Sequence, residues 1–141
     1  APPVVVAVAG RPPARTSERL RYIGYVKELA ECYQAADFTI LASTYEPFGL
    51  VGIESVMCGT PVIFPSSIGC CDAIAPHAKF VFAPDDLADL CATLEQAVRE
   101  YRDGTRRAPL DVARDAVLYD PGVAAHVGAL LTLARQIDAT R

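Results

Sequence analysis

The 141-residue sequence has few of the residues that metal centres and catalytic triads use. It has two histidines, His77 and His126, and neither has a partner set that resembles a triad or a metal site. The five cysteines include no Cys-x-x-Cys pair and their number is odd, which argues against a zinc site and a disulfide framework. This cysteine usage favours a reducing compartment, so we expect a cytoplasmic protein. We also expect no bound metal or other cofactor.

Long apolar runs and excess positive charge are also missing. No apolar run approaches the roughly 20 residues that a membrane span needs, so we expect none. The formal net charge of −4 argues against a nucleic-acid surface. The hydrophobic fraction of 52% suits either a core or a surface that meets a partner domain. The length fits one domain over residues 1–141, and because Met57 is the only methionine we expect a processed start or a piece of a longer protein.

Apolar runs of strand length alternate with segments of helical periodicity. The β-branched run at residues 4–9 predicts a strand that is buried on both faces, as parallel sheets require. This alternation predicts an α/β fold with a Rossmann-like, doubly wound parallel sheet. Asp85 or Asp86 is placed to cap the helix that follows. The pattern predicts strands at 4–9, 21–23, 38–42, 61–64 and 80–82, and helices at 26–35, 49–58, 87–101, 110–117 and 121–137.

The chemistry of the chain centres on residues 46–54, between two of the predicted strands. A loop that leaves a parallel strand is where such folds bind ligands. No Ser, Thr, Asp or Asn stands immediately before the helix near Gly49, so its first N–H groups can face a phosphate. Gly49 and Gly52 remove side chains that would obstruct a close approach.

Glu46 and Glu54 delimit this stretch and suit hydroxyl recognition. An ionised carboxylate offers only acceptors and can hold two hydroxyls of a sugar or ribose. On helical geometry, eight positions correspond to about 80° of rotation, so the two acids could line one side. Two interpretations are open: a nucleotide-sugar site, or a structural arrangement in which Glu46 caps the helix, Pro47 is its first residue and Glu54 is solvated.

The motifs around these glutamates resemble one enzyme family. They are Tyr-Ile-Gly-Tyr-Val at 22–26, Glu-Pro-Phe-Gly-Leu at 46–50, Ile-Glu-Ser-Val-Met-Cys-Gly at 53–59 and Thr-Pro-Val-Ile at 60–63. In this order they resemble the C-terminal, donor-binding domain of the GT-B glycosyltransferases of family 4, the retaining group often labelled "glycosyl transferases group 1". The resemblance extends over roughly residues 4 to 135.

The resemblance implies a role for each matching position. Glu46 would be the catalytic candidate and would contact donor-sugar hydroxyls with Phe48 and Gly49, and Glu54 would hold the ribose. The diphosphate would meet the backbone at Gly49, Leu50 and Val51, and the nucleobase would lie against Tyr25 and Val26. The implied partners are a nucleotide sugar and an N-terminal acceptor domain of the same protein, through which the enzyme could also associate with a membrane. Such donor sites typically need no bound metal.

The chain departs from the family pattern in two places. It has no match to the Gly-Arg/Lys segment and second basic residue that offset the diphosphate charge as the leaving group departs. It also lacks the first strand, near the middle of a 3-2-1-4-5-6 sheet. We therefore expect a gap in the sheet, filled by another part of the polypeptide or by a strand from a partner chain in a homo-oligomer.

Three functions remain after this comparison. The first is the donor-binding domain of a retaining glycosyltransferase of hexosyltransferase type, inactive as the 141 residues alone. The second is a binding module that holds a nucleotide sugar without turnover. The third is a different α/β class, flavodoxin-like or regulatory, in which both glutamates are structural.

Overall fold

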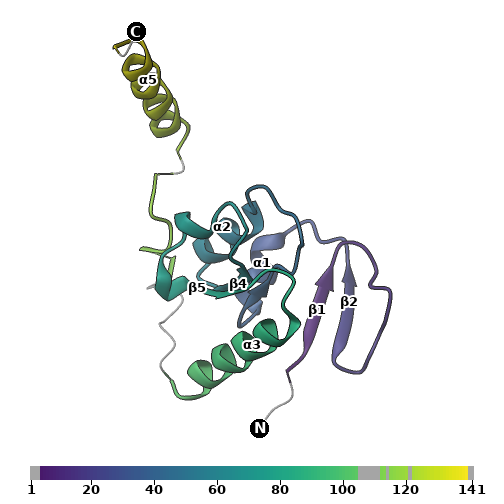
Figure 1. The fold of residues 1–141 in the computed structure, drawn as a ribbon. Helices are drawn as coiled ribbons and strands as arrows, with labels where there is room; N and C mark the ends of the chain where they lie inside the picture. The colour runs from purple at the N-terminus through teal and green to yellow at the C-terminus, as the bar shows by residue number, and fades with distance from the viewer. Residues whose placement is uncertain (1–3, 105–111, 114, 121, 140–141) are drawn as a thin grey trace.

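The computed structural model describes residues 4–104, 112–113, 115–120 and 122–139 (Figure 1). Strands and helices alternate along most of this chain. The elements are β1 (Val6–Ala9), β2 (Leu20–Gly24), α1 (Leu29–Ala35), β3 (Thr39–Ile40), α2 (Leu50–Met57), β4 (Val62–Pro65), β5 (Lys79–Phe82), α3 (Leu87–Arg102) and α5 (Val123–Ala139), with 3-10 turns η1 (Cys71–Ala73) and η2 (Pro76–Ala78). The α/β class predicted from the sequence is confirmed.

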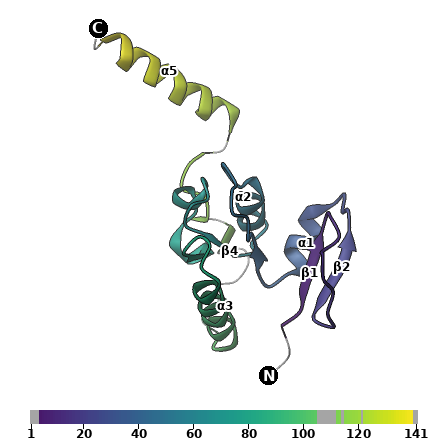
Figure 2. The same cartoon turned by 45° about the vertical axis from the view of Figure 1, so that its right-hand side comes forward.

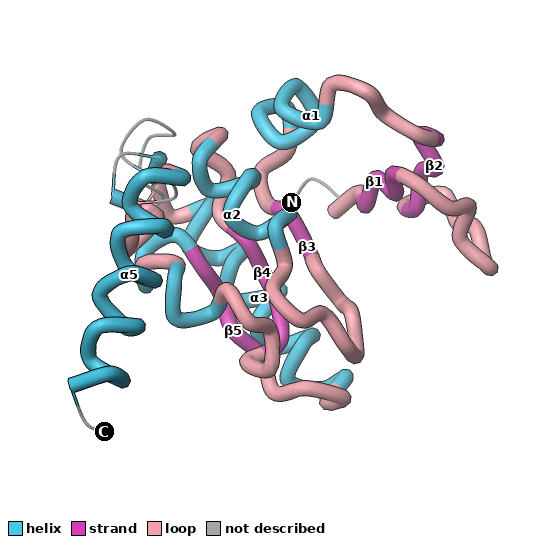
Figure 3. Tube along the Cα trace, turned by 90° about the horizontal axis from the view of Figure 1, so that it is seen from above, coloured by secondary structure: helices cyan, strands magenta, loops and turns pink. Residues whose placement is uncertain are grey.

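The strands form two parallel sheets rather than one. β1 pairs only with β2 among the described residues, with Val6 opposite Leu20, and the second sheet has the order β3-β4-β5. In Figures 1, 2 and 3, β1 lies on the side of its sheet that is nearer to the three-stranded sheet. The expected gap is therefore present, between the open edges of β1 and β3.

The core lies on both faces of β4, which is buried along its whole length. Val62 and Phe64 belong to the cluster that contains Ile53 and Val56 of α2. Ile63, whose side chain points the other way because strand side chains alternate, packs with Phe82 and with Ala97 of α3. A helix thus covers each face of the three-stranded sheet, which is the doubly wound arrangement.

The first strand departs from the sequence prediction in its environment. The prediction of a strand buried on both faces was wrong, because Val4, Val5 and Val6 are 49%, 48% and 38% exposed. The reason is the lack of covering elements: side chains on the faces of a parallel strand are buried by helices packed on those faces, and among the described residues only β2 packs extensively against β1. β3 is an edge strand of the three-stranded sheet among the described residues.

The helices agree with prediction in order and differ in extent. α1 begins at Leu29 rather than at residue 26, and α3 ends one residue beyond the predicted range. Asp86 is the cap of α3, since its side chain accepts a hydrogen bond of 2.9 Å from the Asp89 N–H. For the helix predicted at 110–117, residues 110, 111 and 114 lie outside the described residues, as does Pro121.

α5 projects away from the rest of the described chain (Figures 1 and 2). Its apolar residues are exposed in the described chain: Val127, Leu130 and Leu131 are 47%, 54% and 54% accessible. None of the helices in the described ranges is both long enough and apolar enough to cross a membrane.

Candidate functional site

The turn between Glu46 and Gly49 leads into α2. Gly49 is the N-cap of α2 and has a φ of 85°, a left-handed conformation that glycine adopts without steric cost. Its N–H donates a hydrogen bond of 3.2 Å to Oε1 of Glu46. Glu46 therefore closes its own turn rather than capping α2, for which the described residues supply no capping side-chain hydrogen bond. Within the described chain no hydrogen bond engages its second oxygen, Oε2, which leaves one acceptor of this half-buried carboxylate available.

A second loop, after β4, fixes the position of this turn. The Cys70 N–H donates a 2.7 Å hydrogen bond to the Phe48 carbonyl oxygen. Gly69 lies so close to the turn that a Cβ there would overlap the Pro47 carbonyl. A Cβ at Gly49 would stand 2.6 Å from Cδ1 of Ile68. The two loops thus interlock by backbone contact, at positions where glycine permits the approach.

The start of α2 presents unpaired donors to the same region. Among the described residues no hydrogen bond engages the N–H groups of Leu50 and Val51, whereas the Gly52 N–H bonds the Gly49 carbonyl. Leu50 is 63% exposed. Unpaired N–H groups at a helix start, together with the helix dipole, favour an anion such as a phosphate.

The predicted helical rotation between Glu46 and Glu54 does not occur in the structure. The prediction required helical geometry over all eight positions, but α2 covers only Leu50–Met57 and Glu46 lies in the turn before it. The cause is the left-handed backbone of Gly49, with a φ of 85°, which interrupts helical geometry between the two acids; α2 begins after it, so Pro47 is not its first residue. The relative position of the carboxylates is set by the turn rather than by helix periodicity.

Glu54 is exposed on α2 and has a partner that sequence reasoning missed. The Tyr33 hydroxyl, from α1, donates a 3.0 Å hydrogen bond to Oε2 of Glu54. Tyr33 is only 7% exposed. Burial raises the pKa of its hydroxyl, and the hydrogen bond to Glu54 and the charge of that carboxylate raise it further. Sequence reasoning missed this contact because spacing within one helix carries no information about a partner 21 residues away.

The predicted nucleobase residues belong to the other sheet. Tyr25 and Val26 follow directly after β2, where Gly24 has a φ of 78°. Tyr25 is 79% exposed and Val26 is half-buried. Phe48, by contrast, lies in the Glu46 turn and is 39% exposed. The predicted site residues therefore come from segments on both sides of the gap between β1 and β3.

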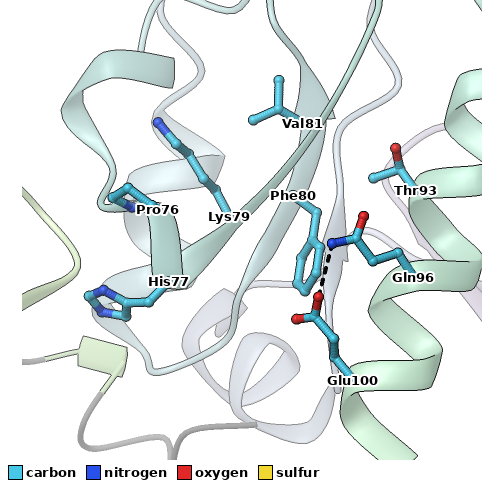
Figure 4. A pocket seen from close by; sticks show the side chains of 8 residues that line it. All are labelled: Pro76, His77, Lys79, Phe80, Val81, Thr93, Gln96 and Glu100. Atoms are coloured by element: carbon cyan, nitrogen blue, oxygen red, sulfur yellow. Dashed lines mark hydrogen bonds between the residues drawn. The ribbon is translucent and has the colours of Figure 1, made fainter. Parts of the chain in front are cut away.

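Two cavities are lined by residues other than the predicted site residues. One, of about 210 Å³, is at the carboxyl ends of the three-stranded sheet and is lined by residues that follow β3, end β4 and β5, and begin α3: Ala42, Ser43, Thr44, Pro65, Phe82, Asp85, Asp86, Leu87 and Leu90. The other, of about 300 Å³, is near the start of β5 and is lined by the residues drawn in Figure 4. There Gln96 donates a 2.9 Å hydrogen bond to Glu100, and both side chains lie beside Phe80.

Cysteine and metal chemistry receive no support from this geometry. Cys70 is fully buried behind the turn, and burial raises the pKa of its thiol. Its neighbour Cys71 is half-buried, with its carbonyl accepting a hydrogen bond from Nζ of Lys79. Over the ranges that the structure describes, no group of three or more His, Cys, Asp or Glu side chains is placed to hold a metal ion.

Comparisons with known proteins identify a family for these motifs. The family model described as glycosyl transferases group 1 matches residues 14–110. This range contains the Glu46 turn, Glu54 and the segment after β2, so every predicted site residue lies inside the match.

Individual relatives agree with this match. The chain is 66% identical, over 99% of its length, to a probable transglycosylase of Burkholderia thailandensis, and it spans 39% of that relative's length. Among solved structures it is similar to sucrose-phosphate synthase from Thermosynechococcus elongatus, with a TM-score of 0.63, 26% identity and coverage of 88% of this chain and 31% of that one. HepE of Anabaena, in complex with UDP-glucose, has a TM-score of 0.55 at 18% identity, over 69% of this chain and 30% of that one, and so indicates the fold alone.

Proposed function

This chain belongs to the glycosyl transferases group 1, and from that membership we propose that it is the donor-binding domain of a retaining glycosyltransferase. In this proposal it forms the C-terminal half of a GT-B enzyme of family 4. The enzyme transfers a hexose from a nucleotide diphosphate sugar to an acceptor, in the cytoplasm and without a bound metal. The observation that carries the proposal is the Glu46 turn, which places a carboxylate directly before the first N–H groups of α2; within the described chain, one carboxylate oxygen and these N–H groups have no hydrogen-bond partner.

Each part of a donor has a matching group in this region. Oε2 of Glu46 would accept from sugar hydroxyls, with Phe48 and Gly49 beside them, and Glu46 would be the catalytic residue. The N–H groups of Leu50 and Val51 and the backbone of Gly49 would meet the diphosphate. Glu54 would accept from the ribose hydroxyls through the oxygen that Tyr33 leaves free.

The remaining part of the donor, the nucleobase, would lie against the segment after β2. Tyr25 and Val26 come from the two-stranded sheet, so a bound nucleotide would bridge the two sheets. Backbone contacts at these positions would leave the choice of base almost independent of side chains. HepE, which has the same fold, was solved with UDP-glucose, and this supports a nucleotide sugar as the ligand class here.

A larger two-domain protein is the second part of the proposal. The chain spans 39% of its transglycosylase relative, and two apolar surfaces are exposed: β1 with its neighbouring valines, and α5. We propose that residues 1–141 act with an N-terminal acceptor domain of the same protein and that another segment of that protein supplies a strand between β1 and β3. The alternative source of the strand is a partner chain. An intact protein that is monomeric by light scattering would exclude the partner chain.

The competing function is a binding module that holds a nucleotide sugar without turnover. In the family, the cations of a Gly-Arg/Lys segment stabilise the departing diphosphate, so this function would follow if the intact protein lacks that segment. Hydrolysis or transfer of the bound sugar by the intact protein, measured by release of the nucleoside diphosphate, would decide between the two functions.

The test of the site is a comparison of two alanine variants. Titration of the intact protein with UDP, GDP and ADP and with their glucose conjugates should identify one base that binds. Glu54→Ala should weaken the nucleotide and the sugar nucleotide alike by about 1–3 kcal/mol, because hydroxyls lose a charged partner. Glu46→Ala should weaken the sugar nucleotide more than the bare nucleotide.

The matched control is Glu31→Ala, which removes an exposed carboxylate from the first turn of α1. It should leave both affinities unchanged. Equal losses for both ligands in Glu46→Ala would contradict the sugar role of Glu46. Failure of all the nucleotides to bind the wild-type protein would remove the donor-binding function.

A further inference from the structure

Tyr33 is a residue to which sequence reasoning gave no function. Its hydroxyl donates to Oε2 of Glu54 on α2, and the residue as a whole is almost completely buried. A buried hydroxyl normally satisfies its hydrogen bond inside the core. This one instead reaches a carboxylate on the exposed surface of the candidate site.

Both the backbone and the side chain of Tyr33 make hydrogen bonds to other elements. Its carbonyl oxygen accepts a hydrogen bond from Oγ1 of Thr60, at 2.5 Å, and another from the Ala36 N–H, at 3.1 Å. Thr60 is itself 2% exposed. The backbone of Tyr33 is therefore fixed from the segment just after α2, while its side chain is fixed by packing. The hydroxyl is held in place before any ligand arrives.

The C-terminal half of α2 takes part in the same hydrogen-bond network. Ser55, next to Glu54 in the chain, is fully buried, and its Oγ lies 2.8 Å from the Thr60 carbonyl oxygen and 2.7 Å from Oγ1 of Thr39. Thr60 thus links the two residues: its hydroxyl donates to the Tyr33 carbonyl oxygen, and its own carbonyl oxygen accepts from the Ser55 hydroxyl. The backbone that carries Glu54 and the hydroxyl that bonds its side chain are therefore positioned by one buried set of hydrogen bonds.

A glutamate on an exposed helix face normally samples several rotamers and loses that freedom when it binds a ligand. A hydrogen bond from a fixed donor selects one rotamer in advance. It uses one acceptor position of Oε2 and leaves Oε1 without a partner in the described chain. The carboxylate still has acceptor positions for two adjacent hydroxyls.

We propose that Tyr33 is a positioning residue that orients the Glu54 carboxylate toward the ribose hydroxyls of the bound nucleotide. This inference rests on the donor-binding function proposed above. The Tyr33 hydroxyl is protonated, and so remains a donor, over the whole neutral range even at the ordinary tyrosine pKa near 10, and burial raises that pKa further.

The prediction concerns preference for ribose rather than affinity alone. Tyr33→Phe keeps the ring and removes only the hydroxyl. It should weaken UDP, GDP or ADP, whichever binds the intact protein, by roughly 5-fold, as expected for one hydrogen bond. It should weaken the 2′-deoxy and 3′-deoxy forms of the same nucleotide less, so that the ribose-to-deoxyribose preference falls. A residue with only a packing role would lower the melting temperature and leave this ratio unchanged.

The experiment is a double-mutant cycle by isothermal titration calorimetry on wild type, Tyr33→Phe, Glu54→Ala and the double variant. Tyr119→Phe removes the hydroxyl of a tyrosine that is 42% exposed and serves as the control, with no change expected. In the Glu54→Ala background, Tyr33→Phe should have no further effect on the ratio, since the oriented group is gone.

The outcomes separate this inference from the function on which it rests. A ribose preference in wild type that Tyr33→Phe leaves intact would overturn the role of Tyr33 alone. Wild-type binding without any ribose preference would overturn the roles of both Glu54 and Tyr33 and leave the donor-binding function standing. If no nucleoside diphosphate binds the wild type, the function is overturned and the role of Tyr33 with it.

Discussion

Gly49→Ala tests whether the interlocked loops hold the Glu46 turn as the structure indicates. Two separate costs arise at this position. A non-glycine residue at a φ of 85° costs about 1–2 kcal/mol. In addition, the new Cβ would lie 2.6 Å from Cδ1 and 2.9 Å from Cγ1 of Ile68, and 3.2 Å from Sγ of Cys70.

The second cost can be estimated from these contacts. Carbon atoms in contact prefer separations of about 3.5–4.0 Å, so Ile68 has to move by roughly 1 Å. Ile68 is 4% exposed and Cys70 is fully buried, which leaves them little room to move. Overpacking of this kind costs about 1–3 kcal/mol. The two costs together predict a loss of about 2–5 kcal/mol, or roughly 6–15 °C in melting temperature for a chain of this length.

Thermal and urea unfolding of purified variants would measure this loss, and two controls separate its parts. Gly104 has a φ of 68° and open space around its Cβ position, so Gly104→Ala should show the conformational cost alone. Gly128→Ala, in α5, has open space and no positive φ and should cost nothing. If Gly49→Ala is no less stable than Gly104→Ala, the close packing of the two loops is refuted.

Two further predictions follow from the pKa directions. Because the pKa of Tyr33 is raised in the folded state, its contribution to stability is complete below the ordinary tyrosine value near 10 and is lost as the pH rises through the raised value. The stability advantage of wild type over Tyr33→Phe, from urea unfolding, should therefore shrink above pH 10 by up to about 1.4 kcal/mol per pH unit; a constant difference would contradict the raised pKa. Cys70 is buried with a raised thiol pKa, whereas Cys91 is exposed, so iodoacetamide at pH 8 should label Cys91 on the order of 100-fold faster, as followed by peptide mass spectrometry; equal rates would show that Cys70 is not buried.

The fold was largely predictable because its elements have strong local signals. The apolar run that forms β4 and the periodicity of α3 each indicate one structure, and Asp86 caps α3 as its position suggested. The exposure of β1 was not predictable from its own residues, since three valines in a row indicate a buried strand whatever lies beside them. Burial depends on elements that are distant in sequence, and among the described residues only β2 packs extensively against β1.

The candidate site was predictable as a motif and only partly as a geometry. The glutamates, the glycine and the helix start were identified from residue types whose chemistry is local. Their arrangement depends on non-local contacts: the loop after β4 that packs against Gly49, and the α1 tyrosine that bonds Glu54. Neither contact leaves a periodic signal, because each joins a single residue to a partner in another element.

These contacts change how the pair of carboxylates should be understood. Glu46 is bonded through Oε1 to the N–H of its own turn, and Glu54 is bonded through Oε2 to a side chain from α1. Each acid therefore uses one oxygen for the protein and keeps the other unengaged in the described chain. Two carboxylates on one helix face would move together with that helix. Here Glu46 is held in the turn that packs against the loop after β4, and Glu54 is held by the contact between α1 and α2. The distance between the two free oxygens is thus fixed by how the loop after β4 and α1 each pack against α2. Substitutions in either of those supports should alter recognition of one end of a donor without altering the other.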